Sequence, residues 1–470
     1  MLVLQVVGQA AGGVLRHLRQ LVDGLEDHRF IVAGPAAVVQ SFERLPNVLG
    51  VWPLPTGGGL NPVGDWRARQ RLRLALDASG APGIDLVHVH GWRAGAAAVD
   101  EVCRHAPVVW TVHTQPPEGA VARWRIGRVL GRLGPAPVQM IAVSRSLAAE
   151  VERAWPKGGA RVWAVRNGLS PQDLEALAKL TRSGRERVRQ HWARRGLGAP
   201  AAARAPERSW NPRADLPAPA VELPFPVPVL GFMGRIWGPK GIFDAVETLA
   251  ALVRAGWPAV LEVAGEGPDE AAARRLARQQ GVGERVAFLG WRQPSEFLSR
   301  IDLLLHPSRS EGGVPYTVME AMAAGVPVVA SRLPPLDEVV AEWDERSGRS
   351  AALGAPGGEF RATETGLLSL ARPGDPADLA RATAACLNDP EATARRAQAA
   401  RRYVRLHLGS EATLDLTDRI YRVALAGPGA ESEAPTGFLK PDPGLAGSGA
   451  RGYNLRQTQN VREDGDQYPS

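Results

Sequence analysis

The chain has few cysteines and no long apolar stretch. Its 470 residues include two cysteines, Cys103 and Cys386, whose separation fits neither a disulfide framework nor a zinc motif. This pattern favours a reducing compartment. No segment reaches the roughly 18 apolar residues of a membrane-spanning helix. The opening run MLVLQVV has strand length and no basic residue before it, unlike a secretory signal peptide. We therefore expect a cytoplasmic protein.

Lysine is scarce too, and the basic charge is unevenly distributed. Arginine supplies all but four of the 56 basic residues, and the net charge is +7. Residues 179–213 alone hold ten basic and two acidic residues. Two interpretations of that stretch stay open: a solvated linker, or contact with an anionic membrane, to which each nearby cation contributes about 1 kcal/mol. No nucleic-acid partner is expected, because aromatic residues are rare among these cations and no known module matches.

The alternation of apolar runs and helical segments predicts two α/β domains. In residues 1–170, short β-rich runs each precede a helical segment, which is typical of a doubly wound parallel sheet. Residues 227–408 repeat this pattern. Since the chain is too long for one ordinary core, we expect each part to fold around its own. The strands expected in the first domain are residues 1–7, 30–34, 84–90, 107–113, 138–144 and 161–165.

Four further segments lie outside or between these elements. Alanine, arginine and proline dominate residues 171–226, which we interpret as a basic insertion and linker. A loop insertion is expected at 341–364, and a helix at 409–426 is expected to pack back on the first domain. Residues 427–470 combine glycine, proline, serine and charge with few residues that could form a core. We therefore expect a disordered C-terminal tail.

Residues 304–331 combine a strand, a glycine loop, a short helix and a second strand. Pro315 suits the start of that helix and Gly325 its end. In parallel sheets ligands bind beyond the carboxyl ends of strands, and a helix N-terminus there favours phosphate. Glu311 and Glu320 frame the helix; carboxylates repel phosphate but accept hydrogen bonds from sugar hydroxyls. The pattern favours a sugar nucleotide, while the alternative is a capping Glu311 and a solvent-facing Glu320.

Two other strand ends carry candidate ligand-binding residues. Gly12 and Gly13 follow the first strand and open a helical run, which is typical of a phosphate- or ligand-facing loop. His113 ends the strand 107–113, and we favour it as a residue facing the ligand crevice. His88 and His90 stay undecided between that role and a structural one. These histidines are not spaced as ligands on one element and no carboxylate or cysteine completes a set, so no metal site is expected.

Several segments occur in the order and spacing of a known family. In the second half these are GRIWGPKG (234–241), AGEGPDE (264–270), VAFLGW (286–291) and PSRSEGGVPYTVMEAMAAGVPVVAS (307–331). In the first half they are GGVLRHL (12–18), DLVHVHG (85–91), VVWTVHT (108–114), IAVSRSL (141–147) and VRNGL (165–169). On these motifs the sequence resembles the retaining GT-B glycosyltransferases of family four, the group 1 type. The resemblance covers most of residues 1–426.

The resemblance implies two Rossmann-like domains that face a cleft, with a sugar nucleotide held mainly by the second. It assigns the diphosphate to Arg235 and Lys240, two cations that can neutralise a departing diphosphate where other enzymes use a metal. Glu320 would bind the ribose hydroxyls, while Glu311 and His113 would bind the donor sugar. The other donor contacts that it implies are Gly12, Gly13, Gly234, Gly265, Gly312, Gly313 and Val314.

One departure from the family pattern concerns the two glutamates. The family usually places seven residues between them, whereas GGVPYTVM contains eight. Because the helix itself matches well, we expect the loop at Gly312 and Gly313 to absorb the extra residue. Glu320 is then the firmer assignment, because the extra residue can displace the Glu311 carboxylate by a few ångströms.

The resemblance implies a metal-independent transferase that moves a hexosyl group from a nucleoside diphosphate sugar to an acceptor hydroxyl, with retained configuration. No cofactor is expected. The expected acceptor is a glycan, a lipid-linked molecule or a small molecule. For a lipid-linked acceptor, residues 179–213 would contact the inner face of the plasma membrane and hold the enzyme there. Two alternatives stay open: a catalytically weak sugar-nucleotide-binding protein, and a GT-B epimerase.

Overall fold

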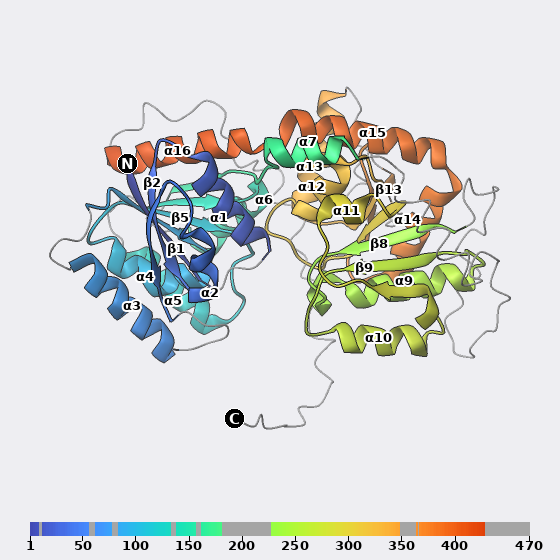
Figure 1. Ribbon diagram of the computed structural model, residues 1–470, viewed down its shortest axis with the longest axis horizontal. Coiled ribbons are helices and arrows are strands. Elements are labelled where there is room, and N and C mark those ends of the chain that lie inside the picture. The colour runs from blue at the N-terminus through green and yellow to red at the C-terminus, as the bar shows by residue number, and fades with distance from the viewer. Residues whose placement is uncertain are drawn as a thin grey trace.

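The computed structural model describes residues 1–8, 12–55, 62–77, 83–132, 138–156, 161–180, 227–347, 363–364 and 366–427. Two α/β domains lie side by side, each built on a seven-stranded sheet (Figure 1). This confirms the predicted GT-B-like arrangement of two doubly wound domains. Both sheets are parallel throughout, except for one antiparallel edge strand in the second.

The first sheet has the order β3-β2-β1-β4-β5-β6-β7. Its strands are β1 (Leu2–Val7), β2 (Arg29–Gly34), β3 (Val48–Pro53), β4 (Leu86–His90), β5 (Val108–Val112), β6 (Val138–Ala142) and β7 (Arg161–Ala164). The helices that connect them are α1 (Gly13–Gly24), α2 (Ala36–Val39), α3 (Pro62–Asp77), α4 (Trp92–Val102), α5 (Ala120–Arg132) and α6 (Arg145–Ala154).

The second sheet has the order β10-β9-β8-β11-β12-β14-β13. Its strands are β8 (Val229–Met233), β9 (Val260–Ala264), β10 (Val286–Phe288), β11 (Leu303–His306), β12 (Val328–Ser331), β13 (Thr363–Glu364) and β14 (Ser369–Ala371). The helices are α7 (Pro171–Ala178), α9 (Ile242–Arg254), α10 (Glu270–Gln279), α11 (Pro294–Leu298), α12 (Tyr316–Ala323), α13 (Pro334–Arg346), α14 (Pro376–Asn388) and α15 (Pro390–His407). Short 3-10 turns lie at η3 (Gly238–Lys240) and η4 (Gly283–Arg285) in this domain, and at η1 (Gln40–Phe42), after α2, in the first.

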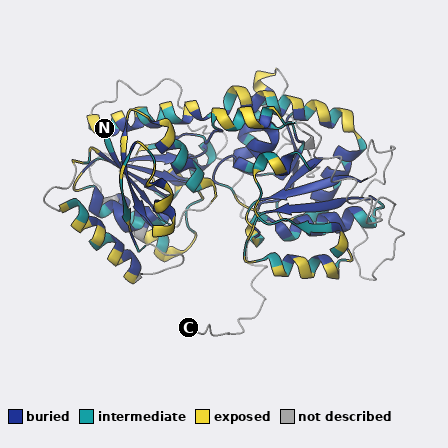
Figure 2. Cartoon of the chain, in the orientation of Figure 1, coloured by how far each residue is buried: buried dark blue, intermediate teal, exposed yellow. Residues whose placement is uncertain are grey.

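Both sheets are buried on both faces, as parallel sheets are (Figure 2). Side chains alternate along a strand, so β1 feeds two cores. Leu4 and Val6 pack with residues of α3, α4, α5 and α6, whereas Val3 and Val7 pack with α1 and α2. The carboxyl ends of the strands are left for loops, which is where the candidate site residues lie.

The chain crosses between the domains at two adjacent points. Leu169 donates its backbone N–H to Leu408, at 2.8 Å, and accepts one from Ser410 at the same distance. Helix α16 (Ser410–Ala426) then lies along the first domain (Figure 1). Its Tyr421 side chain is completely buried and its hydroxyl contacts Gln5 and His88, at 3.2 and 2.7 Å. The last helix is thereby part of the first domain's core.

Some sequence predictions differ from the structure. Residues 341–346 belong to α13 rather than to a loop insertion, because the helix that begins at Pro334 continues to bury side chains such as Asp344. Residues 171–178, predicted within the linker, form α7, which Ser170 caps with its side chain. Strand β3 was not predicted, since its half-exposed residues lack a clear apolar pattern. Most of the basic stretch (181–213) and the predicted tail from 428 onward lie outside the described residues.

Candidate active site

Glu311 lies in the loop between β11 and α12, beside two basic side chains. Its Oε1 lies 2.6 Å from Lys240 Nζ and 3.4 Å from His306 Nε2. Burial acts to raise the pKa of this carboxyl, but His306 and Lys240 outweigh it and lower the pKa to about 2. Glu311 is therefore an anion at every working pH, and the pair joins the two loops that follow β8 and β11.

Arg235 and Lys240 both come from the loop between β8 and α9. Lys240 ends the 3-10 turn η3 and is bound to Glu311, whereas Arg235 is exposed and its guanidinium lies 5.3 Å from the Trp237 ring centroid. No described carboxylate forms an ion pair with Arg235. The loop therefore presents one neutralised and one available cation at the carboxyl end of β8.

Close backbone approach explains the glycines at this edge of the sheet. Gly265 follows β9 with φ +141°, and a Cβ there would lie 1.8 Å from the carbonyl oxygen of Gly234. Since the carbonyl oxygen of Gly234 belongs to the backbone, it cannot move aside as a flexible side chain would, and only glycine fits at position 265. Gly234 and Gly265 thus bring two strand ends together and leave their turns open to a ligand.

Glu320 lies on α12 and its side chain is 3% exposed. The Arg16 guanidinium, from α1 of the first domain, hydrogen-bonds Glu320 and also Asp173, the latter at 2.8 Å. That guanidinium stacks over the Tyr316 ring, 4.5 Å from its centroid. Burial raises the pKa of Glu320 although Arg16 acts to lower it. The carboxylate predicted to bind ribose is therefore held by a cation of the opposite domain.

The glycine loop before α12 contacts the first domain directly. A Cβ on Gly312 would lie 2.2 Å from the His113 carbonyl oxygen, and the Gly312 carbonyl accepts a 2.7 Å hydrogen bond from Ser144. Gln115 donates to the Glu311 carbonyl, also at 2.7 Å. Gly312 therefore lies in the interdomain contact, and Glu311 reaches Lys240.

The remaining predicted positions lie around the same contact. Gly12 precedes α1 with φ +58°, and a Cβ on Gly13 would lie 3.4 Å from the Tyr316 ring. Gly313 packs against Val143 and Val314 is buried. The structure thus brings residues from both ends of the chain to one interdomain site.

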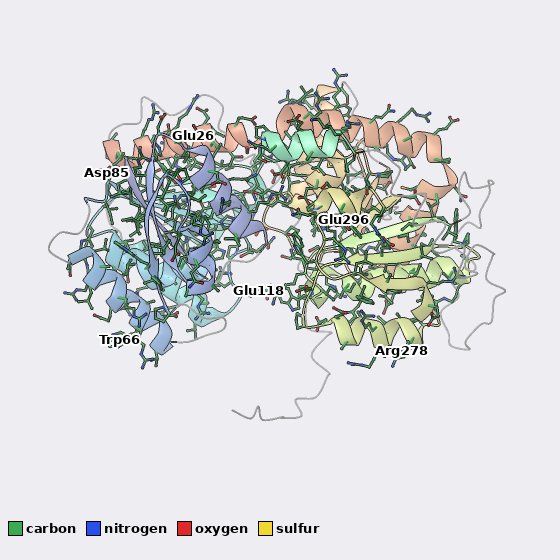
Figure 3. All side chains as sticks on the ribbon, viewed as in Figure 1. Glu26, Trp66, Asp85, Glu118, Arg278 and Glu296 are labelled. Carbon is green, nitrogen blue, oxygen red and sulfur yellow. The ribbon has the colours of Figure 1, made fainter. Side chains whose placement is uncertain are left out.

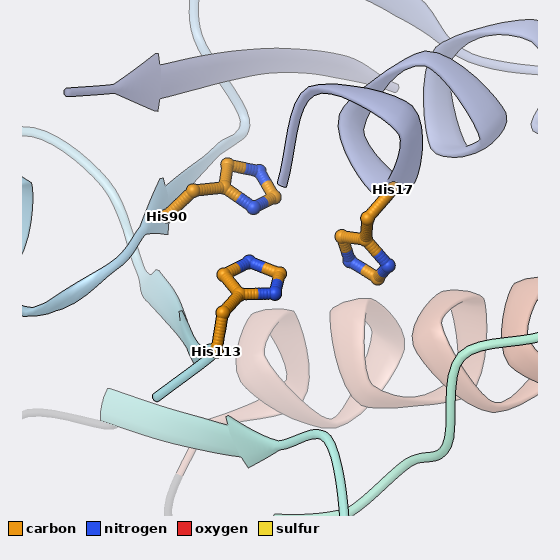
Figure 4. Close-up of side chains that lie close together, drawn as sticks. All are labelled: His17, His90 and His113. Carbon is orange, nitrogen blue, oxygen red and sulfur yellow. The ribbon is translucent and has the colours of Figure 1, made fainter. Parts of the chain in front are cut away.

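Histidines from three elements converge at the carboxyl end of the first sheet (Figure 4). His17 of α1, His90 at the end of β4 and His113 after β5 each offer a ring nitrogen, and these nitrogens all lie within 4.8 Å of one another. Burial lowers the pKa of His17 to about 4, and those of His90 and His113 well below the ordinary value. His88 has a structural role, since its nitrogens contact Tyr421 and Thr111 at 2.7 Å each.

Comparison with known proteins explains this arrangement. The profile described as "Glycosyl transferases group 1" matches residues 227–389, and the profile "Glycosyltransferase Family 4" matches residues 11–173. The chain is a group 1 glycosyltransferase. It is 27% identical to a glycogen synthase of Mycobacterium tuberculosis (strain H37Rv) over 395 residues, which cover 81% of this chain and 77% of the relative.

Further relatives match shorter parts of this glycosyltransferase. It is 38% identical to a 2-deoxystreptamine glucosyltransferase of Streptomyces kanamyceticus over 108 residues, which cover 22% of this chain and 27% of the relative. Among solved structures, Anabaena Alr3699/HepE in complex with UDP and glucose matches with a TM-score of 0.65 and 17% identity, covering 90% of this chain and all of that one. Sucrose-phosphate synthase from Thermosynechococcus elongatus matches with a TM-score of 0.62 and 19% identity, over 91% of this chain and all of that one.

Sequence reasoning missed Arg16, His17, Asp173 and His306 as parts of this site. Arg16 and His17 lie inside the GGVLRHL motif, but a helix pattern alone does not show which face meets another domain. Their partners are distant in the chain, since 304 residues separate Arg16 from Glu320. Only the closed tertiary structure brings them together.

Proposed function

We propose that this glycosyltransferase moves a hexosyl group from a nucleoside diphosphate sugar to an acceptor hydroxyl, with retained anomeric configuration and without a catalytic metal. The observation that carries the proposal is the Glu311–Lys240 pair at the carboxyl ends of β8 and β11, beside the exposed Arg235 and next to the His113 segment. Cations, a carboxylate and neutral imidazole nitrogens are the groups that a diphosphate joined to a sugar requires.

In this mechanism the cations act on the leaving group. Arg235 and Lys240 stabilise the charge that grows on the diphosphate as the bond to the sugar breaks. Glu311 accepts hydrogen bonds from hydroxyls of the donor sugar. His113, which belongs to the first domain, donates a hydrogen bond to a hydroxyl of the same sugar or accepts one from it. The acceptor oxygen bonds to the anomeric carbon on the same face, and its proton passes to the departing phosphate oxygen. This chain therefore needs no separate strong base.

Glu320 takes the ribose hydroxyls, which requires that Arg16 share or release its carboxylate. Support for a sugar nucleotide comes also from the UDP and glucose bound in the Anabaena structure of the same fold. The relatives are named for different acceptors, a 2-deoxystreptamine and a D-inositol 3-phosphate among them. A glycan, a lipid-linked molecule and a small molecule thus all stay candidate acceptors.

Donor profiling tests this function. The enzyme is incubated with UDP-, GDP- and ADP-hexoses, with and without candidate acceptors, and released nucleoside diphosphate is measured. We expect nucleoside diphosphate to be released from the donors of one nucleotide base only, and an acceptor to accelerate that release. The NMR spectrum of the product should show the same anomeric configuration as the donor. Inverted product would contradict the retaining mechanism. Tight donor binding without release would favour the binding protein, and a free epimerised sugar would favour the epimerase.

We also propose that the enzyme contacts membranes peripherally. The structure has no helix, among its described residues, that is long and apolar enough to span a bilayer. The predicted contact through 179–213 lies mostly outside the described residues, but α3 and α5 each carry an exposed tryptophan beside exposed arginines. Trp66 and Trp124 are 59% and 60% exposed there, among exposed Arg67, Arg71 and Arg123 (Figure 3 labels Trp66). Such a surface fits an anionic leaflet.

Vesicle co-sedimentation separates the two contacts. Wild type is expected to bind anionic but not neutral vesicles at low salt and to dissociate as salt rises. Replacing the arginines of 182–213 with glutamine tests the basic stretch, and the double change Trp66→Ser and Trp124→Ser tests the helical surface. No binding by wild type even at low salt would exclude a membrane role for both.

A further inference from the structure

The three converging histidines leave an unusual number of buried nitrogens without partners. Among the described residues, both ring nitrogens of His17, Nδ1 of His90 and Nε2 of His113 lack a partner at good hydrogen-bonding geometry, although the Asn167 side chain interacts with the His17 ring. The side chains of His17 and His90 are almost completely buried, at 2% exposure each. Buried polar groups without partners cost free energy, so a cluster of four such nitrogens indicates a missing ligand.

The hydrogen bonds around His90 place it in the form that coordinates a metal. Its Nε2 lies 2.7 Å from Gln5 Oε1, and the Gln5 amide nitrogen donates to Tyr421 at 3.2 Å. Since the Gln5 oxygen only accepts, the proton of His90 is on Nε2 and the lone pair is on the partnerless Nδ1. Metal-binding histidines typically donate their other ring N–H to such a second residue. Burial lowers the pKa of all three imidazoles, so each is neutral near pH 7.

The distances suit a tetrahedral ion after a small contraction. Around zinc, with Zn–N near 2.0–2.1 Å, three imidazole ring centroids lie about 5 Å apart. Here the centroids are 5.7 Å (His17–His90), 5.0 Å (His17–His113) and 5.8 Å (His90–His113) apart. Three nitrogen ligands favour zinc or a similar transition ion over magnesium or manganese, which prefer oxygen.

We propose that His17, His90 and His113 form a binding site for a transition-metal ion, with Zn²⁺ as the fitting occupant. The three ligands leave a fourth position open for water. The mechanism proposed above uses no metal, and His113 is the one residue that it shares with this site. One consequence does rest on that mechanism: a bound ion takes the His113 nitrogen that would face the donor sugar, so Zn²⁺ inhibits transfer.

Binding is tested with Co²⁺ and Zn²⁺ on protein freed of metal by EDTA and gel filtration. We expect one Co²⁺ per chain with the intense visible absorption of a four- or five-coordinate ion, displaced by Zn²⁺. His17→Gln, His90→Gln and His113→Gln should each weaken Zn²⁺ binding by more than about tenfold, because losing even an outer partner costs about 10–100-fold. Gln5→Met should weaken Zn²⁺ binding by about tenfold, because it removes the acceptor that keeps the His90 proton on Nε2.

His105→Gln is the matched control, because His105 lies in the same domain but pairs with Asp77 on the surface. It should bind Co²⁺ as wild type does. Equal binding by wild type and the triple glutamine variant, or the weak spectrum of six-coordinate Co²⁺, would overturn the site. These readouts need no activity, so a wrong assignment of the transferase reaction leaves them intact. Inhibition by Zn²⁺ that persists in His17→Gln would contradict the inhibitory consequence alone.

Discussion

At the scale of single residues, Glu311 shows how partners override burial. An isolated carboxyl in this loop would be protonated more easily than in water, because burial disfavours the charge. Lys240 and His306 reverse that preference and hold the group as an anion. The same contact places a cation and a carboxylate where a diphosphate joined to a sugar would bind, so each group is preorganised by the other.

The first prediction concerns the two cations. Arg235→Ala and Lys240→Ala each remove a positive charge from the place where the leaving diphosphate gains charge. Loss of one such preorganised group typically costs about 3 kcal/mol, or roughly a hundredfold in turnover. Arg278→Ala is the control, since Arg278 is exposed on α10 (Figure 3). Steady-state kinetics decide the matter: near-normal turnover in both variants would show that the phosphate site lies elsewhere.

The second prediction separates the two glutamates. Glu320→Ala should weaken the binding of free nucleoside diphosphate, because the ribose contact exists without a sugar. Glu311→Ala should leave that affinity nearly unchanged and weaken only the intact donor. Isothermal calorimetry with both ligands measures the difference. Equal losses for both variants would mean that the longer loop has exchanged their roles.

The third prediction is a pH dependence. The pKa of Glu311 is lowered in the folded protein to about 2 from an ordinary 4.5, so its stabilisation is present above pH 4.5 and is lost as pH falls toward 2. Glu311→Gln should lower the free energy of unfolding by about 2 kcal/mol at pH 7, as expected for a charge-assisted hydrogen bond. That difference should shrink with acid. Urea unfolding followed by tryptophan fluorescence measures this difference at pH 7 and in acid. The control Glu296→Gln, at an exposed position, should leave the free energy of unfolding nearly unchanged under both conditions.

At the scale of elements, α1 and α12 are joined across the domains by Arg16. The guanidinium contacts Glu320 and Asp173 and stacks on Tyr316, whose hydroxyl donates to Gln20 at 2.8 Å. Three residues further along α1, Arg19 forms an exposed pair with Asp23. The same helix therefore carries a buried interdomain ion pair and an exposed local one.

This contrast gives the fourth prediction. Arg16→Gln should lower the free energy of unfolding by about 2 kcal/mol, because it leaves the buried Glu320 without its charged partner. Arg19→Gln should change it by less than about 1 kcal/mol, since exposed pairs contribute little. Chemical denaturation of both variants provides the comparison. Equal effects would show that Arg16 does not hold the domains together in solution.

At the scale of the whole molecule, the site is shared between two domains that the chain connects twice at adjacent points. Backbone N–H groups at the start of α6 donate to Glu338 of α13, at 2.7 and 3.2 Å, and Arg166 pairs with Glu342 at 2.5 Å. These contacts surround the crossing at Leu169 and Gly409. These contacts and the crossing join the two domains on the same side as the last helix's entry into the first domain.

The fifth prediction follows from the proposed metal-independent mechanism. Activity should survive EDTA, because in that mechanism Arg235 and Lys240 supply the charge that Asp-x-Asp transferases take from a metal ion. Restoration by manganese after complete loss would contradict the proposed mechanism. If preparations carry zinc at the histidine site, EDTA should raise activity rather than lower it. Assays before and after metal removal, with the metal content measured, distinguish these outcomes.

Most strands and helices, the two α/β domains and the family could be predicted from the sequence alone. Strand runs such as residues 107–113 are local, and the pattern of apolar residues and glycines that marks them depends on near neighbours. Glu311, Glu320, Arg235 and Lys240 were found as candidates because each lies in such a local motif. Elements with weak patterns were missed, as β3 was.

Only the tertiary structure decided which side chains meet. Arg16 reaches Glu320, Tyr421 reaches His88 of β4, and His17 joins His90 and His113 from a helix that carries no metal-ligand spacing. The physical reason is that periodicity shows which face of an element is buried but not which element covers it. Contacts across hundreds of residues depend on the packing of whole domains, and so does the site that lies between them.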